Sequence, residues 1–311
     1  MVNFAPAFLA AFAATLAATN ALAATGLHKD GYVYGLDPDW TVAYDRNLTE
    51  LARYYTPGNL AGMSRVDAAP AALGGKCTAL TVNELTNLPG WPAVAQDIVR
   101  LWGGTSYNLW TTWDGVTRTQ TCVGDGIVSL VPTGNRQCTL NNVTTSGILV
   151  NAAGSVAITI TSGLSATAGE TVTKASTLGA SYTASVTVGV PDLISATASF
   201  TASVSFTNTY GTSFETTVSN QVQKTVTLTA APGSQCELTL TDETCHQSST
   251  GTVPFTATGD FRIGFNSRVN GHYYWSYGLD GFLPVDQRSS YAQFTGSINS
   301  YSKGKYKGVC T

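Results

Sequence analysis

The chain has 311 residues, enough for one large domain or two modest domains with their own cores. Only 11% of the residues are charged, and Thr, Ser, Gly and Ala dominate, a composition typical of β-rich secreted proteins. The formal net charge of -3 and a pI near 5.6 argue against a nucleic-acid-binding protein, because no basic face is large enough to neutralise many phosphates.

The first segment, Met1 to Ala23, is predicted to be a secretory signal peptide. An apolar run is followed by Ala21-Leu22-Ala23, a small-x-small cleavage pattern. The alternative is an uncleaved anchor, because no Lys or Arg precedes the apolar run. No other segment reaches the ~18 apolar residues of a transmembrane helix. We therefore expect a secreted, extracellular protein.

The next part of the chain is predicted to mix strands and helices. Tyr32 to Trp40 is typical of a strand that ends in a turn. Asn47 to Tyr55 is predicted to be a short helix, because Asn47 and Glu50 have the spacing of a capping box. Asp67 to Gly75 indicates a loop or linker. Pro92 to Trp102 is predicted to be a second helix that Gly103 and Gly104 end.

Two groups of aromatic residues are candidates for receptor or glycan binding, because Trp and Tyr rings can stack on sugars. For both groups a place in the core is the favoured alternative. Asn47 and Asn142 lie in N-x-T sequons and are predicted glycosylation sites. Tyr277-Gly278-Leu279-Asp280 repeats Tyr34-Gly35-Leu36-Asp37, which suggests that the last segment returns to the N-terminal part. The candidate binding residues are Trp110, Trp113, Tyr273, Tyr274 and Trp275.

The six cysteines are an even set, and in an exported protein they indicate disulfides. Fifteen pairings are open. Proximity in the sequence favours Cys236–Cys245 and Cys122–Cys138, which leaves Cys77–Cys310. No cysteine lies between positions 138 and 236, so this stretch carries no covalent cross-link to the rest of the chain.

From about Ser146 the composition shifts to alternating strand patterns, and the longest of these predicts a β-hairpin over Leu178 to Thr207. Two arms keep a period of two around a tip at Val190, Pro191, Asp192 and Leu193. The apolar positions are Leu178, Ala180, Tyr182, Ala184, Val186, Val188, Ile194, Ala196, Ala198, Phe200, Ala202, Val204 and Phe206. The hydroxyl-bearing positions are Ser181, Thr183, Ser185, Thr187, Ser195, Thr197, Ser199, Thr201, Ser203 and Ser205.

This hairpin has the chemistry of a barrel wall. Each arm has about the 9–11 residues that a tilted strand needs to cross a bilayer, and neither arm carries a charge. The apolar positions would face lipid and the hydroxyl positions the lumen. The alternative is an amphipathic hairpin packed on a soluble sandwich. Before any insertion, we expect the apolar face to lie on neighbouring strands such as Thr216 to Thr229.

The flanks of the hairpin resemble the pore module of aerolysin-like β-pore-forming proteins. A strand, a hairpin with a Pro tip, a Ser/Thr-rich strand, the turn V-T-L-T-A-A-P-G and the run V-P-F-T-A-T follow one another in that order. The resemblance covers about residues 146–265. It implies that the hairpin is an insertion tongue, that copies of the chain oligomerise on a target membrane, and that the tongues form a shared barrel.

The resemblance implies a mainly β fold with an elongated aerolysin-like pore module and a smaller α+β or β-rich head domain. We expect the pore module at 146–265. The head is expected at 24–145, completed by 266–311.

No catalytic motif is found. The three histidines are far apart in sequence, and no H-E-x-x-H, C-x-x-C, G-x-S-x-G or P-loop pattern occurs. The carboxylate pairs Asp37/Asp39 and Asp280/Asp286 could serve a glycosidase, but Asp beside Gly and Pro is ordinarily turn chemistry. We expect no enzyme activity, no cofactor and no metal. Two functions remain: a membrane-perforating protein with an unidentified lipid or glycan receptor, and a secreted non-lytic glycan-binding or cell-wall-associated protein.

Overall fold

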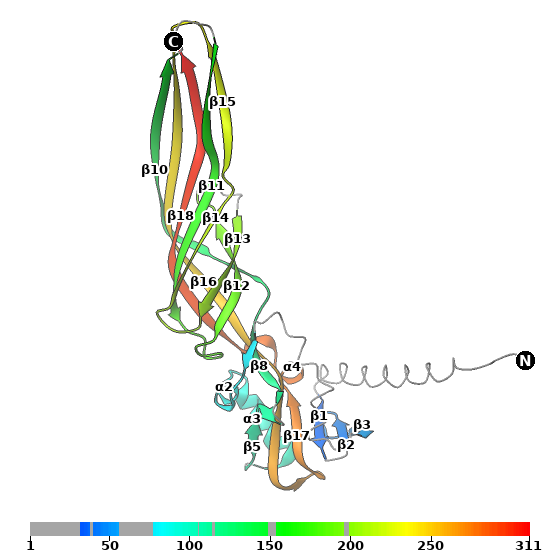
Figure 1. Ribbon diagram of the computed structural model, residues 1–311. Helices are drawn as coiled ribbons and strands as arrows, with labels where there is room; N and C mark the ends of the chain where they lie inside the picture. Colours follow the sequence, from blue (N-terminus) through cyan, green and yellow to red (C-terminus); the bar gives the residue numbers. More distant parts are fainter. Residues whose placement is uncertain are drawn as a thin grey trace, which may run out of the picture. The chain divides into compact units, whose positions relative to one another are not determined.

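The computed structural model describes residues 32–37, 40–55, 77–104, 106–113, 116–148, 154–195 and 199–311. The fold is mainly β with large antiparallel sheets, which confirms the predicted fold class (Figure 1). The described residues divide into two compact units. The first holds residues up to Gly124 together with Ser176–Ala180 and Pro254–Ser290, and the second holds Asp125–Ala175, Ser181–Val253 and Tyr291–Thr311.

The first unit is built around an antiparallel sheet of β1 (Val33–Leu36), β2 (Trp40–Tyr44), β3 (Glu50–Tyr55), β17 (His272–Gly278) and the later part of β16 (Gln235–Val269). β1 pairs with β17, so the last segment does return to the N-terminal part as far as Gly278. Shorter strands complete the unit: β4 (Cys77–Ala79), β5 (Asn108–Trp110), β6 (Thr112–Trp113), β7 (Val116–Thr117) and β8 (Thr119–Val123).

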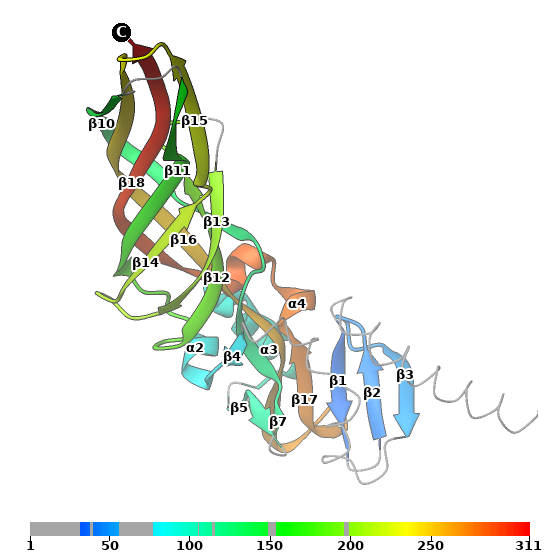
Figure 2. The same cartoon turned by 45° about the horizontal axis from the view of Figure 1, so that its top comes forward.

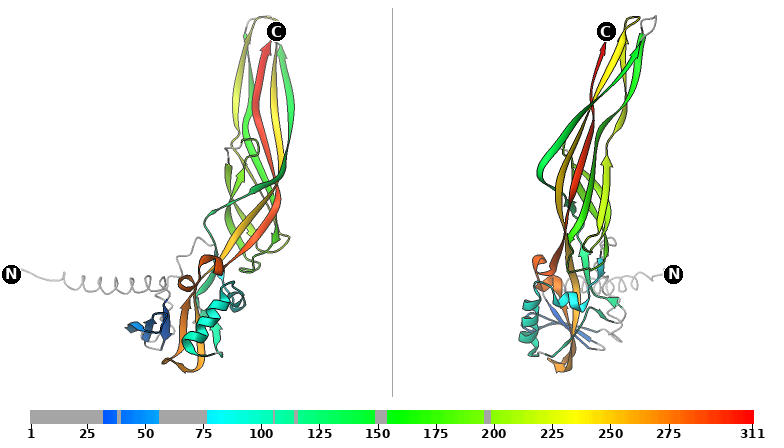
Figure 3. Two further views of the ribbon diagram at one scale, coloured as in Figure 1. Left: turned by 180° about the vertical axis from the view of Figure 1, so that it is seen from behind. Right: turned by 90° about the vertical axis from the view of Figure 1, so that its left-hand side faces the viewer.

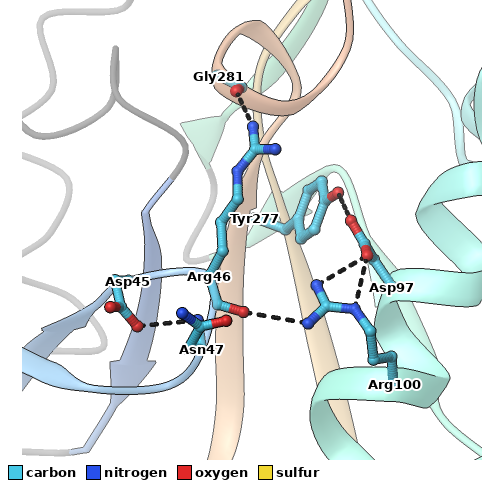
Figure 4. A network of polar contacts seen from close by, with 7 residues as sticks. All are labelled: Asp45, Arg46, Asn47, Asp97, Arg100, Tyr277 and Gly281. Carbon is cyan, nitrogen blue, oxygen red and sulfur yellow. Dashed lines mark hydrogen bonds and ion pairs between the residues drawn. The ribbon is translucent and has the colours of Figure 1, made fainter.

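Helix α3 (Trp91–Trp102) packs on this sheet and confirms the predicted second helix. Its buried residues, Val94, Ile98, Leu101 and Trp102, have the spacing of one helix face. Trp102 lies 5.3 Å from the Trp275 ring between centroids. Asp97 of α3 accepts a 3.3 Å hydrogen bond from the Tyr277 hydroxyl, and burial raises the pKa of this tyrosine (Figure 4). The other helical elements are α2 (Val82–Thr86), α4 (Leu279–Phe282) and the 3-10 helix η3 (Val285–Arg288).

The predicted helix over Asn47 to Tyr55 is wrong, because residues 50–55 form β3. Asp45 rather than Asn47 accepts the local backbone hydrogen bonds, from the amides of Asn47 and Thr49, both at 2.8 Å. This closes a turn between β2 and β3, and Leu48 takes a φ of 60° in it. A real capping box forms instead at Thr81 and Glu84, where α2 begins.

The second unit contains a sheet of long strands with the order β14–β11–β18–β16, in which β10 pairs with β16 and β15 with β11. These strands run side by side in both views of Figure 3. A separate three-stranded sheet has the order β13–β12–β9. The strands are β9 (Ile127–Ser129), β10 (Val131–Ile148), β11 (Gly154–Lys174), β12 (Thr183–Pro191), β13 (Ser199–Thr207), β14 (Ser213–Ser219), β15 (Val222–Ala230) and β18 (Ser289–Cys310), with the first part of β16.

The unit boundaries differ from the expected domain limits. Residues 125–145 and 291–311, expected in the head, belong to the second unit, and residues 254–265, expected in the pore module, belong to the first. The reason is strand length. β10 and β16 have 18 and 35 residues and run past the expected limits at 146 and 265, and β18 pairs with β11 of the second unit.

Candidate functional site

The predicted hairpin is present as β12 and β13, which lie side by side in Figure 2. The two nine-residue strands pair antiparallel from Thr183 opposite Thr207 to Pro191 opposite Ser199. β9 pairs in parallel with the other edge of β12, over residues 187–189.

The alternation of the sequence separates a buried face of the hairpin from an exposed one. Successive side chains of a strand point to opposite faces, so the even positions lie on one face of the hairpin and the odd positions on the other. On β12 the buried residues are Ala184, Val186, Val188 and Val190, and on β13 they are Val204 and Phe206, whereas Phe200 and Ala202 are half-buried. The exposed residues are Thr183, Ser185, Ser199, Thr201, Ser203 and Ser205; Thr187 is half-buried.

The hairpin is shorter at its base than predicted. Gly179 and Ser181 have φ values of 63° and 59°, a left-handed conformation that a strand does not adopt. Leu178 and Ala180 therefore belong to the first unit, and Tyr182 precedes β12. These three residues continue the alternating pattern of the sequence, but they are not part of the strand.

The tip is also displaced. Val190 and Pro191 are strand residues opposite Phe200 and Ser199, so the connecting loop begins at Asp192. Ile194 and Ser195, predicted on the two faces of the second arm, lie in this loop. The remaining predicted positions of that arm, Ala196, Thr197 and Ala198, lie outside the described residues.

The loop at the tip is held closely by side chains. Asp192 is buried, and its carboxylate accepts hydrogen bonds from the amides of Ile194 (3.1 Å) and Ser195 (2.9 Å). The Leu193 amide donates to the Ser300 hydroxyl of β18 at 2.9 Å, and the Leu193 carbonyl accepts from Arg136 of β10. The tip is therefore fixed to two strands of the long-stranded sheet.

Aromatic contacts hold the base of the hairpin. Phe206 of β13 lies 5.0 Å from Phe294 of β18 and 6.3 Å from Phe214 of β14, measured between ring centroids. The Asn208 amide donates to the Tyr182 carbonyl at 2.9 Å and closes the base. The apolar face thus lies on β14 and β18. β14 covers only the beginning of the predicted stretch 216–229, and the contact with β18 was not predicted.

The sheet face beneath the hairpin carries one residue that the sequence analysis missed. Ala166, Ala168, Glu170 and Val172 are the buried side chains of this stretch of β11, and Glu170 is the only acid among them. The Ser249 hydroxyl donates to its carboxylate. Burial raises the pKa of Glu170, against the smaller lowering effect of the Ser249 hydrogen bond. A charged residue in phase with small apolar residues was the available signal in the sequence.

The disulfides differ from those predicted. The structure pairs Cys77 with Cys122, Cys138 with Cys245 and Cys236 with Cys310. Proximity in the sequence misleads because residues 235–269 form one strand, in which Cys245 lies nine positions and about 30 Å beyond Cys236. Each observed pair joins neighbouring strands: β4 with β8, β10 with β16, and β16 with β18.

Among the described residues, one group of acidic, Cys and His side chains comes close enough together to suggest a metal site. Its ligand atoms, from Cys138, Glu243 and Cys245, lie within 4.8 Å of one another. The two sulfurs are joined in a disulfide, so neither is a thiolate that could bind a metal.

The candidate binding aromatics are largely packed inside the first unit. Trp113 and Trp275 are buried. Trp110 and Tyr274 are half-buried, and the Arg262 guanidinium lies 5.0 Å and 4.3 Å from their ring centroids. Two of the five candidates thus lie in the core, two are partly buried beside Arg262, and Tyr273 is exposed.

The predicted glycosylation sites are both exposed in the structure. Asn47 lies in the turn between β2 and β3, which is tied to its surroundings by two arginines (Figure 4). Arg46 donates to the Gly281 carbonyl at 2.9 Å, and Arg100 donates to the Arg46 carbonyl at 3.2 Å. Asn142 lies on β10.

The carboxylates considered for a glycosidase have structural partners where the structure describes them. Asp37 lies 3.0 Å from the ring of buried His272. Asp280 binds Arg288 at 2.7 Å and accepts hydrogen bonds from the Thr258 hydroxyl and the Gly259 amide. Asp286 bonds the neighbouring Gln287 side chain, and Asp39 lies outside the described residues.

Within the described part of the chain, no helix is both long and apolar enough to span a membrane. No protein-family model matches the sequence, and no curated protein shows a significant match.

Several solved structures are similar to this one. Parasporin-2, a Bacillus thuringiensis toxin that recognizes cancer cells, has 23% identity and a TM-score of 0.36, with 76% of this chain and 97% of that chain covered. Mpp75Aa1.1, a β-pore-forming protein of Brevibacillus laterosporus, has 9% identity and a TM-score of 0.34, covering 70% and 84%. The aerolysin-like protein of Bombina maxima has 8% identity and a TM-score of 0.24, covering 62% and 97%. The structures similar to this chain thus include an aerolysin-like protein, the family that the sequence resembles.

Proposed function

We propose that this chain is a secreted pore-forming protein that binds a target membrane, oligomerises and contributes β12 and β13 of each copy to a transmembrane β-barrel. The observation that carries the proposal is the hairpin itself: two uncharged nine-residue strands with one apolar face covered and one hydroxyl face exposed. Nine residues suffice for a tilted strand to cross a bilayer. Apolar residues toward lipid and hydroxyls toward water are the two faces of a barrel wall.

The attachment of the hairpin supports a role that needs movement. All six cysteines lie outside residues 139–235, so no disulfide joins the hairpin to the sheet. Much of its buried face is small, with Ala184 and three valines on β12. Small side chains bury little apolar area, so detaching the hairpin costs less than it would with Leu or Ile.

Insertion requires several copies of the chain. A single hairpin in hydrocarbon leaves a row of unpaired N–H and C=O groups along each outer edge, and each group costs several kcal/mol. Burial of side chains as small as Ala and Val does not offset that cost. The partners are therefore a target membrane and further copies of the same chain.

The proposed protein works outside the cell and is not an enzyme. Three disulfides fit a protein that works outside the cell. The protein acts without catalysis, in keeping with a sequence that carries no recognised catalytic motif.

A disulfide that pins the hairpin to the sheet tests the proposal. The 2.9 Å bond between the Leu193 amide and the Ser300 hydroxyl brings these residues within disulfide range, so the variant is Leu193→Cys with Ser300→Cys. We expect the oxidised variant to bind vesicles made from a total cell-lipid extract, to release no entrapped dye, and to recover release on reduction.

The matched control links β12 to β13 without pinning them to the sheet. Thr183 and Thr207 are opposite each other, with hydroxyls 2.9 Å apart, and the two strands would stay neighbours in a barrel. Oxidised Thr183→Cys with Thr207→Cys should therefore still release dye. The parent chain under the same reductant controls for the native disulfides. Equal dye release by the pinned and parent proteins would contradict the proposal and favour a non-lytic binding protein.

A further inference from the structure

Glu170 is a buried carboxyl at the centre of the face on which the hairpin lies. Its side chain is 1% exposed. Gly296 of β18 is its register partner, and Ser249 belongs to β16, the strand on the far side of β18. The carboxylate therefore reaches across β18 to meet the Ser249 hydroxyl.

Gly296 makes this crossing possible. A Cβ at position 296 would lie 2.8 Å from Glu170 Oε2 and 2.0 Å from the Gly169 carbonyl oxygen. One carboxylate oxygen, Oε1, accepts from Ser249, and Oε2 has no hydrogen-bond partner among the described residues. A charged carboxylate in this place is thus poorly compensated.

The hairpin passes over this carboxyl. Its base contacts β18 at Phe294, 5.0 Å from Phe206, and its tip contacts β18 at Ser300, 2.9 Å from the Leu193 amide. Phe294, Gly296, Ile298 and Ser300 alternate along the strand and share one face. Gly296 lies between the two contact points, so the docked hairpin separates Glu170 from water.

No other charged group faces Glu170 among the described residues of the surrounding strands. The buried residues of β12, β13, β14 and β18 are apolar or Ser, and those of β16 nearest Ser249 are Gly251 and Val253. Asp192 and Arg136 are engaged at the tip. Asp242 is bonded to Tyr301, which follows Ser300 and so points to the opposite face.

We propose that the ionisation of Glu170 controls the release of the hairpin: the neutral carboxyl keeps the hairpin docked, and the carboxylate favours its departure. This regulation rests on the proposed function. A neutral carboxyl is stable without contact to water and can still accept a hydrogen bond from Ser249. The charged carboxylate, in contrast, becomes hydrated only when the hairpin leaves.

The strength of hairpin docking depends on pH because the pKa of Glu170 differs between the docked and released forms. Burial raises the pKa of Glu170 in the docked form, and release returns it toward the ordinary value of 4.5. Docking is then strongest below the ordinary pKa and weakens as the pH rises through the raised one. Between these two values the opening constant rises about tenfold for each pH unit.

Hydrogen exchange of the hairpin amides, without any membrane, measures this opening. Parent, Glu170→Gln and Glu215→Gln proteins are compared at equal pH, from about pH 4 to about pH 8, so that the intrinsic exchange rate cancels. Glu215 is the matched control, because it is exposed on β14 opposite Gly169. We expect equal protection of residues 183–191 and 199–207 in the parent and Glu170→Gln at the acid end. Toward pH 8 the parent should exchange faster than Glu170→Gln, and the ratio of the two rates should increase with pH until the pH passes the raised pKa of Glu170. Glu215→Gln should follow the parent.

A second variant tests the same inference if Glu170→Gln does not fold. Ser249→Ala removes the hydrogen bond that lowers the pKa of Glu170, so the rise in exchange should continue to a higher pH than in the parent. A parent-to-variant ratio of one at every pH for Glu170→Gln, or an unshifted profile for Ser249→Ala, would overturn the inference.

Dye release separates this inference from the proposed function. Exchange that rises as expected, in a protein that never permeabilises vesicles, supports the ionisation-controlled opening and rejects the pore. Dye release that is equal for parent and Glu170→Gln at every pH, with unchanged exchange, rejects the control by Glu170 and leaves the pore in place.

Discussion

At the scale of single residues, the first unit depends on a close fit around His272. The ring is buried, with Nδ1 3.0 Å from Asp37 and Nε2 2.9 Å from the Tyr44 hydroxyl. It lies directly over Gly35 of β1, where an added Cβ would come within 2.4 Å of the imidazole. Burial lowers the pKa of His272, against the smaller raising effect of the Asp37 carboxylate. Glycine at position 35 is therefore required by packing.

We predict that Gly35→Ala destabilises the first unit by about 1–3 kcal/mol, because the buried ring or the strand has to move. Chemical denaturation followed by tryptophan fluorescence measures the change. Gly124→Ala is the control, since no atom lies within 4 Å of its added Cβ, and it should leave the midpoint almost unchanged. Equal midpoints for the two variants would show that the ring accommodates the methyl group.

Single residues also mark what the sequence can and cannot specify. The buried and exposed sides of Val186, Val188, Ser203 and Ser205 follow from alternation alone, because neighbouring side chains of a strand point in opposite directions. The role of Glu170 does not, since it depends on Gly296 and Ser249, which are distant in sequence. Contacts of this kind need the strand order.

At the scale of elements, local signals were sufficient for α3 and for the paired part of the hairpin, but they failed where tertiary pairing decides. Asn47 and Glu50 have the spacing of a capping box, yet residues 50–55 pair with β2 as a strand. Proximity in the sequence favours the pair Cys236–Cys245, yet residues 235–269 form one long strand between β10 and β18, along which these cysteines lie far apart. The observed disulfides instead join neighbouring strands, so they need the strand order.

We predict that substitution by Lys has opposite effects on the two faces of β13. Ala202 and Ser203 are adjacent, and only Ser203 is fully on the exposed face. We predict that Ala202→Lys loses dye release, because a Lys toward lipid at mid-bilayer costs about 2–4 kcal/mol in each copy. Ser203→Lys should retain release and shift the pore toward anions, because a ring of positive charge in the lumen attracts them.

Vesicle leakage and reversal potentials under a salt gradient measure these outcomes. Thermal unfolding of both variants controls for damage to the docked fold. If Ala202→Lys permeabilises vesicles as well as Ser203→Lys does, the assignment of the apolar face to lipid is incorrect.

At the scale of the whole molecule, the covalent cross-links and the hairpin occupy different parts of the chain. The disulfides join β4 to β8, β10 to β16, and β16 to β18, and residues 139–235 have none. Both compact units are built from segments distant in sequence, because β16 and β18 contribute to each. The proposed change therefore moves β12 and β13 and leaves the cross-linked strands paired.

Electron cryo-microscopy of the protein bound to lipid vesicles tests the central claim most directly, because it shows assembly and insertion in one measurement. We predict closed rings in which β12 and β13 of every copy form a continuous barrel across the bilayer, while the three disulfide-linked strand pairs keep their docked-form pairing. Single copies lying on the membrane, or rings in which Phe206 still packs against Phe294, would contradict the account.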